Sequence, residues 1–386
     1  MRCEAVFHDI YNRDPDGVAF CPYRISPLGA HIDHQHGKIN GIALDKGIHI
    51  AWSPKHNGVV EVNSLNFPKR AQFHVGSVQA RKAGDWADHL RGATRMLAEK
   101  YPLRMGLSAV IEGELPIGGL SSSAAVIIAF LTALAGVNGI ALGDWELIMM
   151  AKAAENRYVG VNCGKLDQSC EVLCRRDHLL YMDCRDDSYE LIPVNPAMKP
   201  FRIAVLFSGL ERSLASSAYN LRQDECKAAA YSLLAFAGMD YGKFADARLR
   251  DVPADVFERY GDRLPENFRR RATHYFTEIA RAEAWRRGDL DAYGRLVFES
   301  GRSSVENYQC GCPELIALYD IMTRTEGVYG GRFSGAGFKG CCMALIDPDR
   351  AEQVERNVTA AYLRAFPALE GKFSFHLCDS ADGVKA

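Results

Sequence analysis

The 386-residue sequence lacks a long apolar run, an apolar leader and an excess of charge of either sign. Its longest apolar stretch, residues 124–137, is too short to span a bilayer. The formal net charge is only −2 at pH 7, so no broad basic field would attract nucleic acid or an anionic membrane. We therefore expect a cytoplasmic protein that acts on small molecules, without nucleic-acid or membrane partners. No feature indicates an oligomeric state.

Paired CxxC spacing is also missing, although the chain contains 12 cysteines. Zinc sites and thiol redox centres usually show such pairs, and disulfides are rare in a reducing cytosol. The cysteines are therefore expected to be thiols that behave as small buried hydrophobic residues.

The chain is long enough for two cores, and it has neither an internal repeat nor a long Ser/Gly linker. We place one domain at 1–195 and a second at 196–386. Strands are expected at 39–52, 59–62, 71–78, 107–112, 179–183 and 201–207, and helices at 86–101, 144–158 with Asp144 as N-cap, 166–173, 217–237, 274–287 and 350–365. Residues 21–37 are expected to form a loop over a site, and 240–271 a charged span. This mixture of strands and helices predicts an α+β protein.

A Gly/Ser turn between a strand and an apolar helix is the first candidate for chemistry. Gly118 and Gly119 allow a tight turn, and Ser121, Ser122 and Ser123 follow where a helix exposes unpaired N–H groups. Such amides and the helix dipole stabilise a phosphate. No lysine follows in the Walker position, so an ordinary P-loop is not indicated. The alternative is a core helix that is simply capped by serine.

Phosphoryl transfer also needs a carboxylate for Mg²⁺, an acceptor for the substrate proton and a positive charge for the transition state. Asp167 stands at the start of an expected helix, Glu155 lies twelve residues earlier, and Arg24 lies in the distant loop segment. Taken singly, Asp167 could be a helix cap and Arg24 part of a surface ion pair.

Five ordered segments together resemble the galactokinase branch of the GHMP kinases, the family of galactokinase and of the homoserine, mevalonate and phosphomevalonate kinases. YRISPLGAHIDHQHG (23–37) resembles the galactokinase signature, and PIGGLSSSAA (116–125) resembles the family's phosphate loop, one residue shorter. Three more segments are similar to family motifs: ENRYVGVNCGKLDQ (155–168), SLASSAYNLRQDEC (213–226) and GVYGGRFSGAGFKGC (327–341). The resemblance covers nearly the whole chain.

The resemblance implies the GHMP kinase fold, with an N-terminal α+β domain that carries the phosphate loop and a ferredoxin-like C-terminal α+β domain. It implies ATP as the donor and Mg²⁺ as the metal. Asp167 would accept or orient the anomeric hydroxyl, and Arg24 would stabilise the transferring phosphoryl group. Ser123 and Glu155 would hold the metal. The residues expected to bind the nucleotide are Gly118, Gly119, Leu120, Ser121, Ser122, Ser123 and Trp86. The residues expected to contact the sugar are Ala30, His31, Asp33, Gly164, Lys165, Tyr219 and Lys339. For Trp86, helix core is the alternative to a place near adenine.

Ala30 is the departure from galactokinases that bears on the substrate, because their signature has a glutamate there that accepts a hydrogen bond from the primary hydroxyl of the sugar. Without this glutamate, the site would not repel a substrate carboxylate, and the cations Lys165 and Lys339 would attract one. The chain therefore resembles the galacturonokinases of this branch, and D-galacturonate is the expected substrate.

Three alternatives stay open at this point. One is a kinase for a neutral sugar, galactose or L-arabinose, and another is a catalytically silent sugar sensor with the same fold. The third concerns His31, His34 and His36, whose spacing is a weak signal for a metal site.

Overall fold

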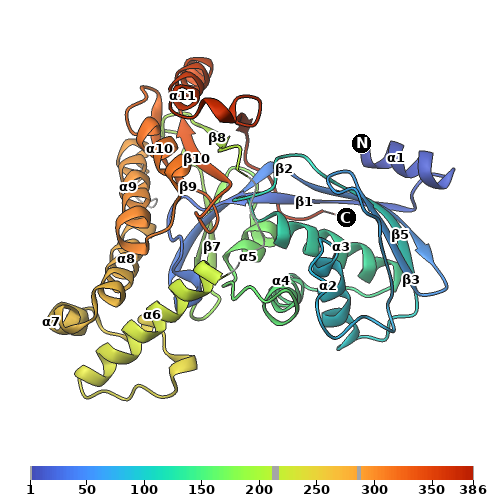
Figure 1. Ribbon diagram of the computed structural model, residues 1–386, viewed down its shortest axis with the longest axis horizontal. Coiled ribbons are helices and arrows are strands. Elements are labelled where there is room, and N and C mark those ends of the chain that lie inside the picture. Colours follow the sequence, from blue (N-terminus) through green and yellow to red (C-terminus); the bar gives the residue numbers. More distant parts are fainter. Residues whose placement is uncertain (1, 211–216, 285–287, 386) are drawn as a thin grey trace.

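The structure is a computed structural model that describes residues 2–210, 217–284 and 288–385 (Figure 1). Helices of the first half are α1 (Arg2–Tyr11), α2 (Asp88–Ala98), α3 (Ser122–Val137), α4 (Asp144–Ala153), a π-helical segment (Ala154–Val159) and α5 (Leu166–Leu173). Its strands are β1 (Gly17–Ile25), β2 (Lys38–Lys55), β3 (Val59–Ser64), β4 (Ala71–His74), β5 (Gly106–Gly113), β6 (His178–Asp183) and β7 (Tyr189–Pro193).

Helices predominate in the second half. They are α6 (Ser217–Phe236), α7 (Ala254–Tyr260), α8 (Glu266–Ala282), α9 (Leu290–Ser303), α10 (Pro313–Met322) and α11 (Ala351–Ala365). The strands are β8 (Arg202–Phe207), β9 (Val328–Phe333), β10 (Cys341–Ile346) and β11 (Ser374–Cys378).

Each half is built around its own sheet. The first sheet has seven strands in the order β4-β3-β5-β2-β6-β7, with β1 paired to β2. The second has four antiparallel strands in the order β11-β8-β10-β9. The expected α+β class is confirmed. The boundary between 195 and 196 stays a prediction, and the end of the chain returns to the first half, where Lys385 forms a bridge with Phe20.

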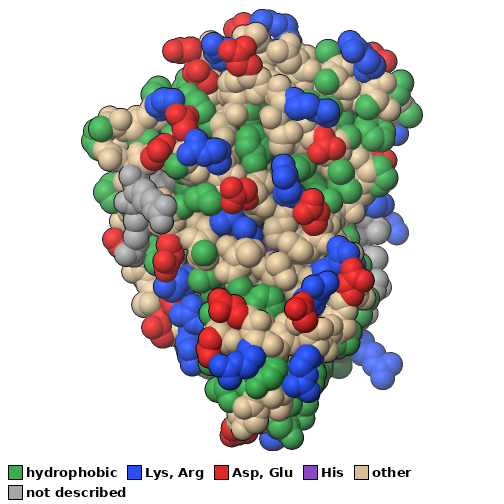
Figure 2. Space-filling model, turned by 90° about the vertical axis from the view of Figure 1, so that its left-hand side faces the viewer, with side chains coloured by type: hydrophobic (Ala, Val, Ile, Leu, Met, Phe, Trp, Pro, Cys, Tyr) green, Lys and Arg blue, Asp and Glu red, His purple; other side chains and the backbone are tan. Residues whose placement is uncertain are grey.

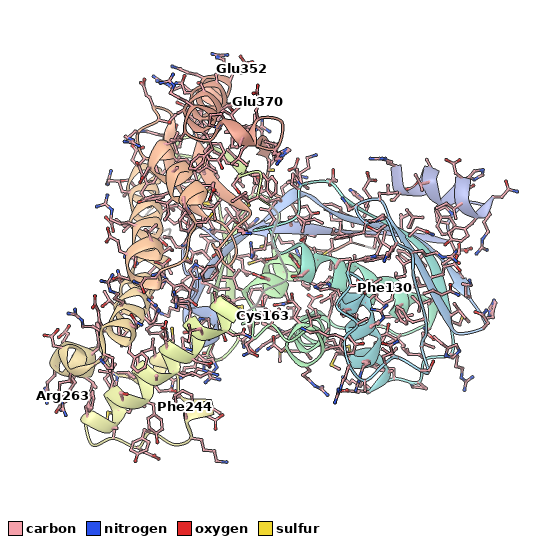
Figure 3. All side chains as sticks on the ribbon, in the orientation of Figure 1. Phe130, Cys163, Phe244, Arg263, Glu352 and Glu370 are labelled. Carbon is pink, nitrogen blue, oxygen red and sulfur yellow. The ribbon has the colours of Figure 1, made fainter. Side chains whose placement is uncertain are left out.

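Helix α3 is the centre of the first core. It is apolar on nearly every side, and it packs against β1, β2, α2 and α4. Phe130, labelled in Figure 3, is completely buried in it. A helix buried on all sides is held rigidly, so the N–H groups at its first turn have a fixed direction.

The expected loop at 21–37 begins as a strand, because β1 extends to Ile25 and pairs with β2. Pro22 misled the prediction, since proline lacks the N–H that a central strand needs. In the structure, the β1–β2 register shifts between Pro22 and Arg24, and proline is tolerated at such irregularities.

Two helix starts also differ from expectation. Gly143, not Asp144, is the N-cap of α4, and Asp144 stands in the first turn, where its charge favours the helix dipole. The charged span 240–271 contains α7 and the beginning of α8. Its charges are not all solvated, because Arg271 is buried and its Nε lies 2.7 Å from an oxygen of Glu225.

Charges of both signs are interspersed on the face shown in Figure 2. Within the described residues, none of the helices is both long and apolar enough to cross a membrane.

The contact between α9 and β9 gives a prediction for stability. A Cβ added at Gly294 would lie 2.1 Å from the carbonyl oxygen of Tyr329, so Gly294→Ala should lower the free energy of unfolding by about 1–3 kcal/mol. Gly136→Ala is the matched control in α3, since nothing lies within 4 Å of its added Cβ. Urea unfolding of both variants measures the difference, and equal stabilities would contradict the close packing of α9 on β9.

Candidate active site

A cavity of about 660 Å³ contains most of the expected site residues. It is lined from β1, the Gly/Ser turn, α5, α6 and the last Gly-rich segment, by side chains that include Arg24, Asp33, Ser123, Asp167, Tyr219 and Ala336. Cys163, which also lines it, lies between α6 and the first half in Figure 3. The cavity therefore combines residues of both halves.

The Gly/Ser turn has the backbone of an anion-binding loop. Gly118, Gly119 and Ser121 have φ values of 134°, 88° and 61°, in the left-handed region. Ser121 is the N-cap residue of α3, but its side chain makes no cap hydrogen bond. Its hydroxyl oxygen is buried and has no partner among the described residues. An unsatisfied buried hydroxyl beside free helix N–H groups suits a phosphate better than a simple serine cap does.

The last Gly-rich segment supports this turn from the second half. A Cβ at Gly335 would lie 2.9 Å from the Cα of Gly119, and one at Gly340 would lie 2.6 Å from the carbonyl carbon of Gly118. Both positions also have positive φ. Backbone therefore packs directly on backbone where the last Gly-rich segment meets the turn.

Arg24 and Asp167, far apart in sequence, meet beneath this turn. Arg24 Nε and Nη2 donate to the same oxygen, Asp167 Oδ1, at 2.8 and 2.7 Å, and Nη1 donates to the carbonyl of Gly119 at 3.3 Å. Burial opposes the charge of Arg24, but the charge of Asp167 and the hydrogen bonds to it, together with Cys170 and Glu171, raise the pKa of the guanidinium. The Asp167 side chain is 28% exposed, and Oδ2 has no hydrogen-bond partner among the described residues. That oxygen is available to a ligand.

A second polar group lies at the start of α3. Ser123 Oγ donates to Glu155 Oε1 at 2.7 Å, and Gln168 Nε2 donates to Glu155 Oε2 at 2.5 Å. Hydroxyl and carboxylate oxygens are ligands that Mg²⁺ accepts, so this pair fits a metal beside a phosphate. Gln168, which directly follows Asp167, was not among the site residues predicted from the sequence.

The lining residues expected to contact sugar form another group, the sugar end of the cavity. The backbone N–H of Leu166 donates to Asp33 Oδ2 at 3.2 Å, while burial and the charge of Asp167 raise the pKa of Asp33. A Cβ at Gly164 would lie only 1.9 Å from Asp33 Oδ2. Glycine at 164 is therefore required for the position of this carboxylate.

His31, Ala30 and Tyr219 complete that end. His31 stacks on Tyr308 with ring centroids 4.2 Å apart, and burial, followed by the charge of Arg332, lowers its pKa well below the ordinary value. Its ring is therefore neutral. Ala30 lines the cavity with a methyl group, and its carbonyl lies 3.0 Å from His274 Nε2. Tyr219 lines the cavity from α6.

Trp86 lines the cavity from the turn just before α2, and it also packs against the edge of the first core. Its ring stacks on that of Phe67, with the ring centroids 5.7 Å apart and an angle of 3° between the ring planes. Its Nε1 donates to the carbonyl of Lys69 at 2.9 Å. The position of adenine beside it stays a prediction.

Three expected site residues do not line this cavity. The Leu120 side chain is buried in the core, because the turn directs it inward. Lys165 pairs with Asp187 and faces a separate cavity. Lys339 is exposed outside the lining. Residues 213–216 of the fourth motif lie outside the described residues.

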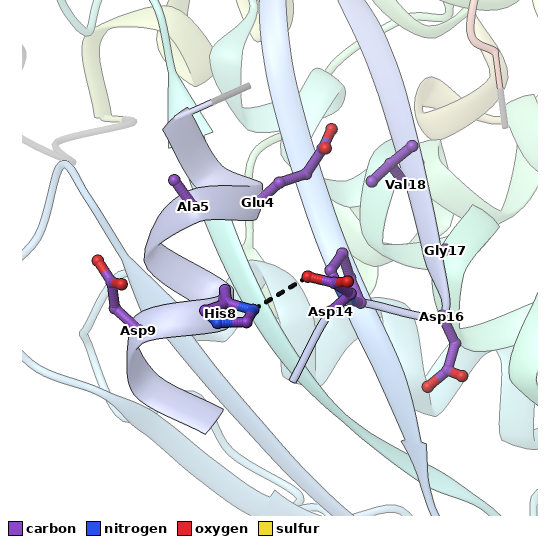
Figure 4. A pocket seen from close by; sticks show the side chains of 9 residues that line it. Glu4, Ala5, His8, Asp9, Asp14, Asp16, Gly17 and Val18 are labelled. Atoms are coloured by element: carbon purple, nitrogen blue, oxygen red, sulfur yellow. Dashed lines mark hydrogen bonds and ion pairs between the residues drawn. The ribbon is translucent and has the colours of Figure 1, made fainter. Parts of the chain in front are cut away.

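Another hollow lies beside α1 and contains none of these groups. Figure 4 shows Glu4, Asp9, Asp14 and Asp16 around it, and His8 Nδ1 lies 3.0 Å from Asp14 Oδ1.

Comparison with known proteins agrees with this architecture. The family model for the GHMP kinases N terminal domain matches residues 88–175, that for the GHMP kinases C terminal matches 282–364, and the galactokinase galactose-binding signature matches 5–54. The crystal structure of Lactococcus lactis galactokinase complexed with galactose has a TM-score of 0.88 at 26% identity, covering 99% of this chain and 98% of that one.

Relatives with similar sequences indicate the kind of sugar kinase to which the chain belongs. Galacturonokinase from Arabidopsis thaliana is 38% identical over 95% of this chain and 93% of its own length. Galactokinases from a Roseiflexus species and from human are 32% and 31% identical, each over 98% of this chain and at least 94% of their own. The chain belongs to the GHMP kinase family. Within it, the chain is an ATP:sugar 1-phosphotransferase of the galactokinase and galacturonokinase type.

The contact between Gly164 and Asp33 gives a prediction for binding. Gly164→Ala should raise the KM for the sugar at least tenfold and leave the KM for ATP within about twofold, because the new Cβ would meet the Asp33 carboxylate and the backbone N of His34, 2.9 Å away, rather than the phosphate turn. Initial-rate kinetics with each substrate varied in turn measure both constants. An unchanged sugar KM would show that Asp33 does not hold the sugar.

Proposed function

We propose that this enzyme transfers the γ-phosphoryl group of ATP to the anomeric hydroxyl of D-galacturonate, giving galacturonate 1-phosphate and ADP. The observation that carries the proposal is Ala30, a small apolar side chain in the wall of the sugar end. A glutamate there would accept a hydrogen bond from a primary hydroxyl but would repel a carboxylate. The identity to a galacturonokinase, 38% against 30–33% for the galactokinases compared, also supports it.

The lining groups near Ala30 leave room for an acid. His31 is neutral and Tyr219 offers a hydroxyl, while the charge of buried Arg332, which lowers the pKa of His31, is paired with buried Glu278 behind the wall. Asp33 is the lining carboxylate nearest to Ala30 in the sequence. In this proposal it accepts hydrogen bonds from the ring hydroxyls of the sugar.

The two carboxylate oxygens of Asp167 have different roles in the proposed phosphoryl transfer. Oδ1 is fixed by Arg24, and Oδ2 faces the cavity as the acceptor for the anomeric proton. The sugar oxygen then forms a bond to the γ-phosphorus as the bond from phosphorus to the ADP oxygen breaks. Arg24, also bonded to Gly119 of the phosphate turn, places positive charge beside the transferring group.

The Ser123 and Glu155 oxygens would hold Mg²⁺, which neutralises phosphate charge when it is bound. The first-turn N–H groups of α3 bind the phosphates in this proposal.

The direct experiment is ATP consumption with Mg²⁺ and D-galacturonate, D-glucuronate, D-galactose or L-arabinose, compared by kcat/KM. The proposal expects the highest value for galacturonate. A higher value for a neutral sugar would refute the acid specificity and leave the kinase class intact.

A kinase for a neutral sugar is the second candidate, and one observation favours it. Lys165 and Lys339, expected to attract a carboxylate, do not line the cavity. L-Arabinose has no C6 substituent and would need no acceptor at residue 30. The same panel of four sugars distinguishes this candidate.

Ala30→Glu should lower kcat/KM for galacturonate by at least 100-fold and change that for galactose by less than about tenfold, because the new carboxylate repels only the acid. Ala30→Gln is the matched control, since it adds similar volume without charge. Equal losses for the two sugars would remove the charge argument.

Asp167→Asn should lower kcat by about 10²–10⁴, the usual contribution of a positioned acid–base group. Asp240→Asn, on the exposed surface, should retain full activity. Thermal unfolding of both variants controls for folding. Near-normal turnover of Asp167→Asn would assign proton acceptance to another group.

A further inference from the structure

A second, smaller cavity adjoins the sugar end of the active site. Its volume is about 240 Å³, room for several water molecules at about 30 Å³ each. Asp33, Cys163 and Gly164 line both cavities, so the two share a wall. In Figure 3, Cys163 marks this place, between α6 and the first half of the chain.

Positive charge gathers around this cavity. Its lining contains the cations Lys152, Lys165, Lys227 and Arg248, and Asp33 as the single carboxylate. Lys165 pairs with Asp187, and Lys227 lies 3.8 Å from Asp224. Two of the four cations therefore have carboxylate partners outside the lining.

Within the described part of the chain, no ion pair joins Lys152 or Arg248 to a carboxylate, although Asp33 of the same lining lies near enough to Lys152 for their charges to interact. Arg248 Nη1 donates to the carbonyls of Ala245 and Ala247, each at 2.8 Å. Its Nε is buried and makes no hydrogen bond to the described residues. The guanidinium is thus bound only by neutral carbonyls, and an anion in the cavity that Arg248 lines would neutralise its charge.

The charges of these cations also lower the pKa values of two neighbouring histidines. Burial, followed by the charges of Arg248 and Lys227, lowers the pKa of His34 to about 3. Burial, followed by Arg248 and Lys165, lowers the pKa of His36. Asp251 opposes the shift at His36 but does not reverse it. Burial is the first cause at both histidines and the cations add to it, so neither ring offers negative charge to balance the four cations of the lining.

We propose that this side cavity is an anion site, which takes a small oxyanion, a phosphate or carboxylate group, next to the sugar. Such a group reaches the cavity from one of two sources: a free anion, or the carboxylate of the acceptor itself across the shared wall. Binding of an oxyanion does not depend on which sugar the enzyme phosphorylates, so the test stands apart from the proposed function.

The test is calorimetric titration of inorganic phosphate at constant ionic strength into the full-length protein. A saturating non-hydrolysable ATP analogue first occupies the phosphate turn. The proposal expects one phosphate per chain, with affinity lowered at least tenfold by Lys152→Met and by Arg248→Leu. Lys243→Met, exposed and outside the cavity, is the matched control and should bind phosphate normally.

Absence of phosphate binding, or binding that is equal in the wild type and in folded Lys152→Met, would overturn the proposal. Two further arms identify the source of the anion. Displacement of phosphate by saturating D-galacturonate but not by D-galactose would assign the site to the carboxylate of the acceptor. Displacement by neither sugar would assign it to a free anion.

Discussion

The buried ion pair between Arg24 and Asp167 is the interaction on which the active site depends. It joins the end of β1 to the start of α5, and a third bond from Arg24 reaches the Gly/Ser turn at Gly119. The guanidinium is almost completely buried, so its charge would be costly without the carboxylate. Because both donors use Oδ1, the pair leaves Oδ2 for the substrate. Orientation of the acceptor oxygen and position of the positive charge thus come from one contact.

Close backbone packing is the second constraint. The phosphate turn of the first half touches glycines of the second half, where no side chain fits. The same principle acts at the sugar end, where Gly164 leaves space for Asp33. The substrate therefore meets groups fixed by contacts across the two halves, and rigid placement of this kind lowers the cost of orienting the reactants.

Much of this could be predicted from the sequence, because motifs specify backbone shape and spacing. The helix at 166–173, the Gly/Ser turn and the α+β class follow from local patterns, and all three are present. The direction of Lys165 could not be predicted, since it depends on Asp187 in a distant turn. The beginning of α8 was missed because its charged residues resemble a solvated span, whereas several are buried and paired. Side-chain direction and buried charge are tertiary properties.

The central claim is that phosphate is placed on the anomeric oxygen of a sugar acid. The most direct measurement is ³¹P and ¹H NMR of the product formed from ATP, Mg²⁺ and D-galacturonate. We expect one new phosphorus signal coupled to the anomeric proton of galacturonate, together with ADP. Phosphate on another oxygen, or no product from galacturonate while galactose is phosphorylated, would contradict it.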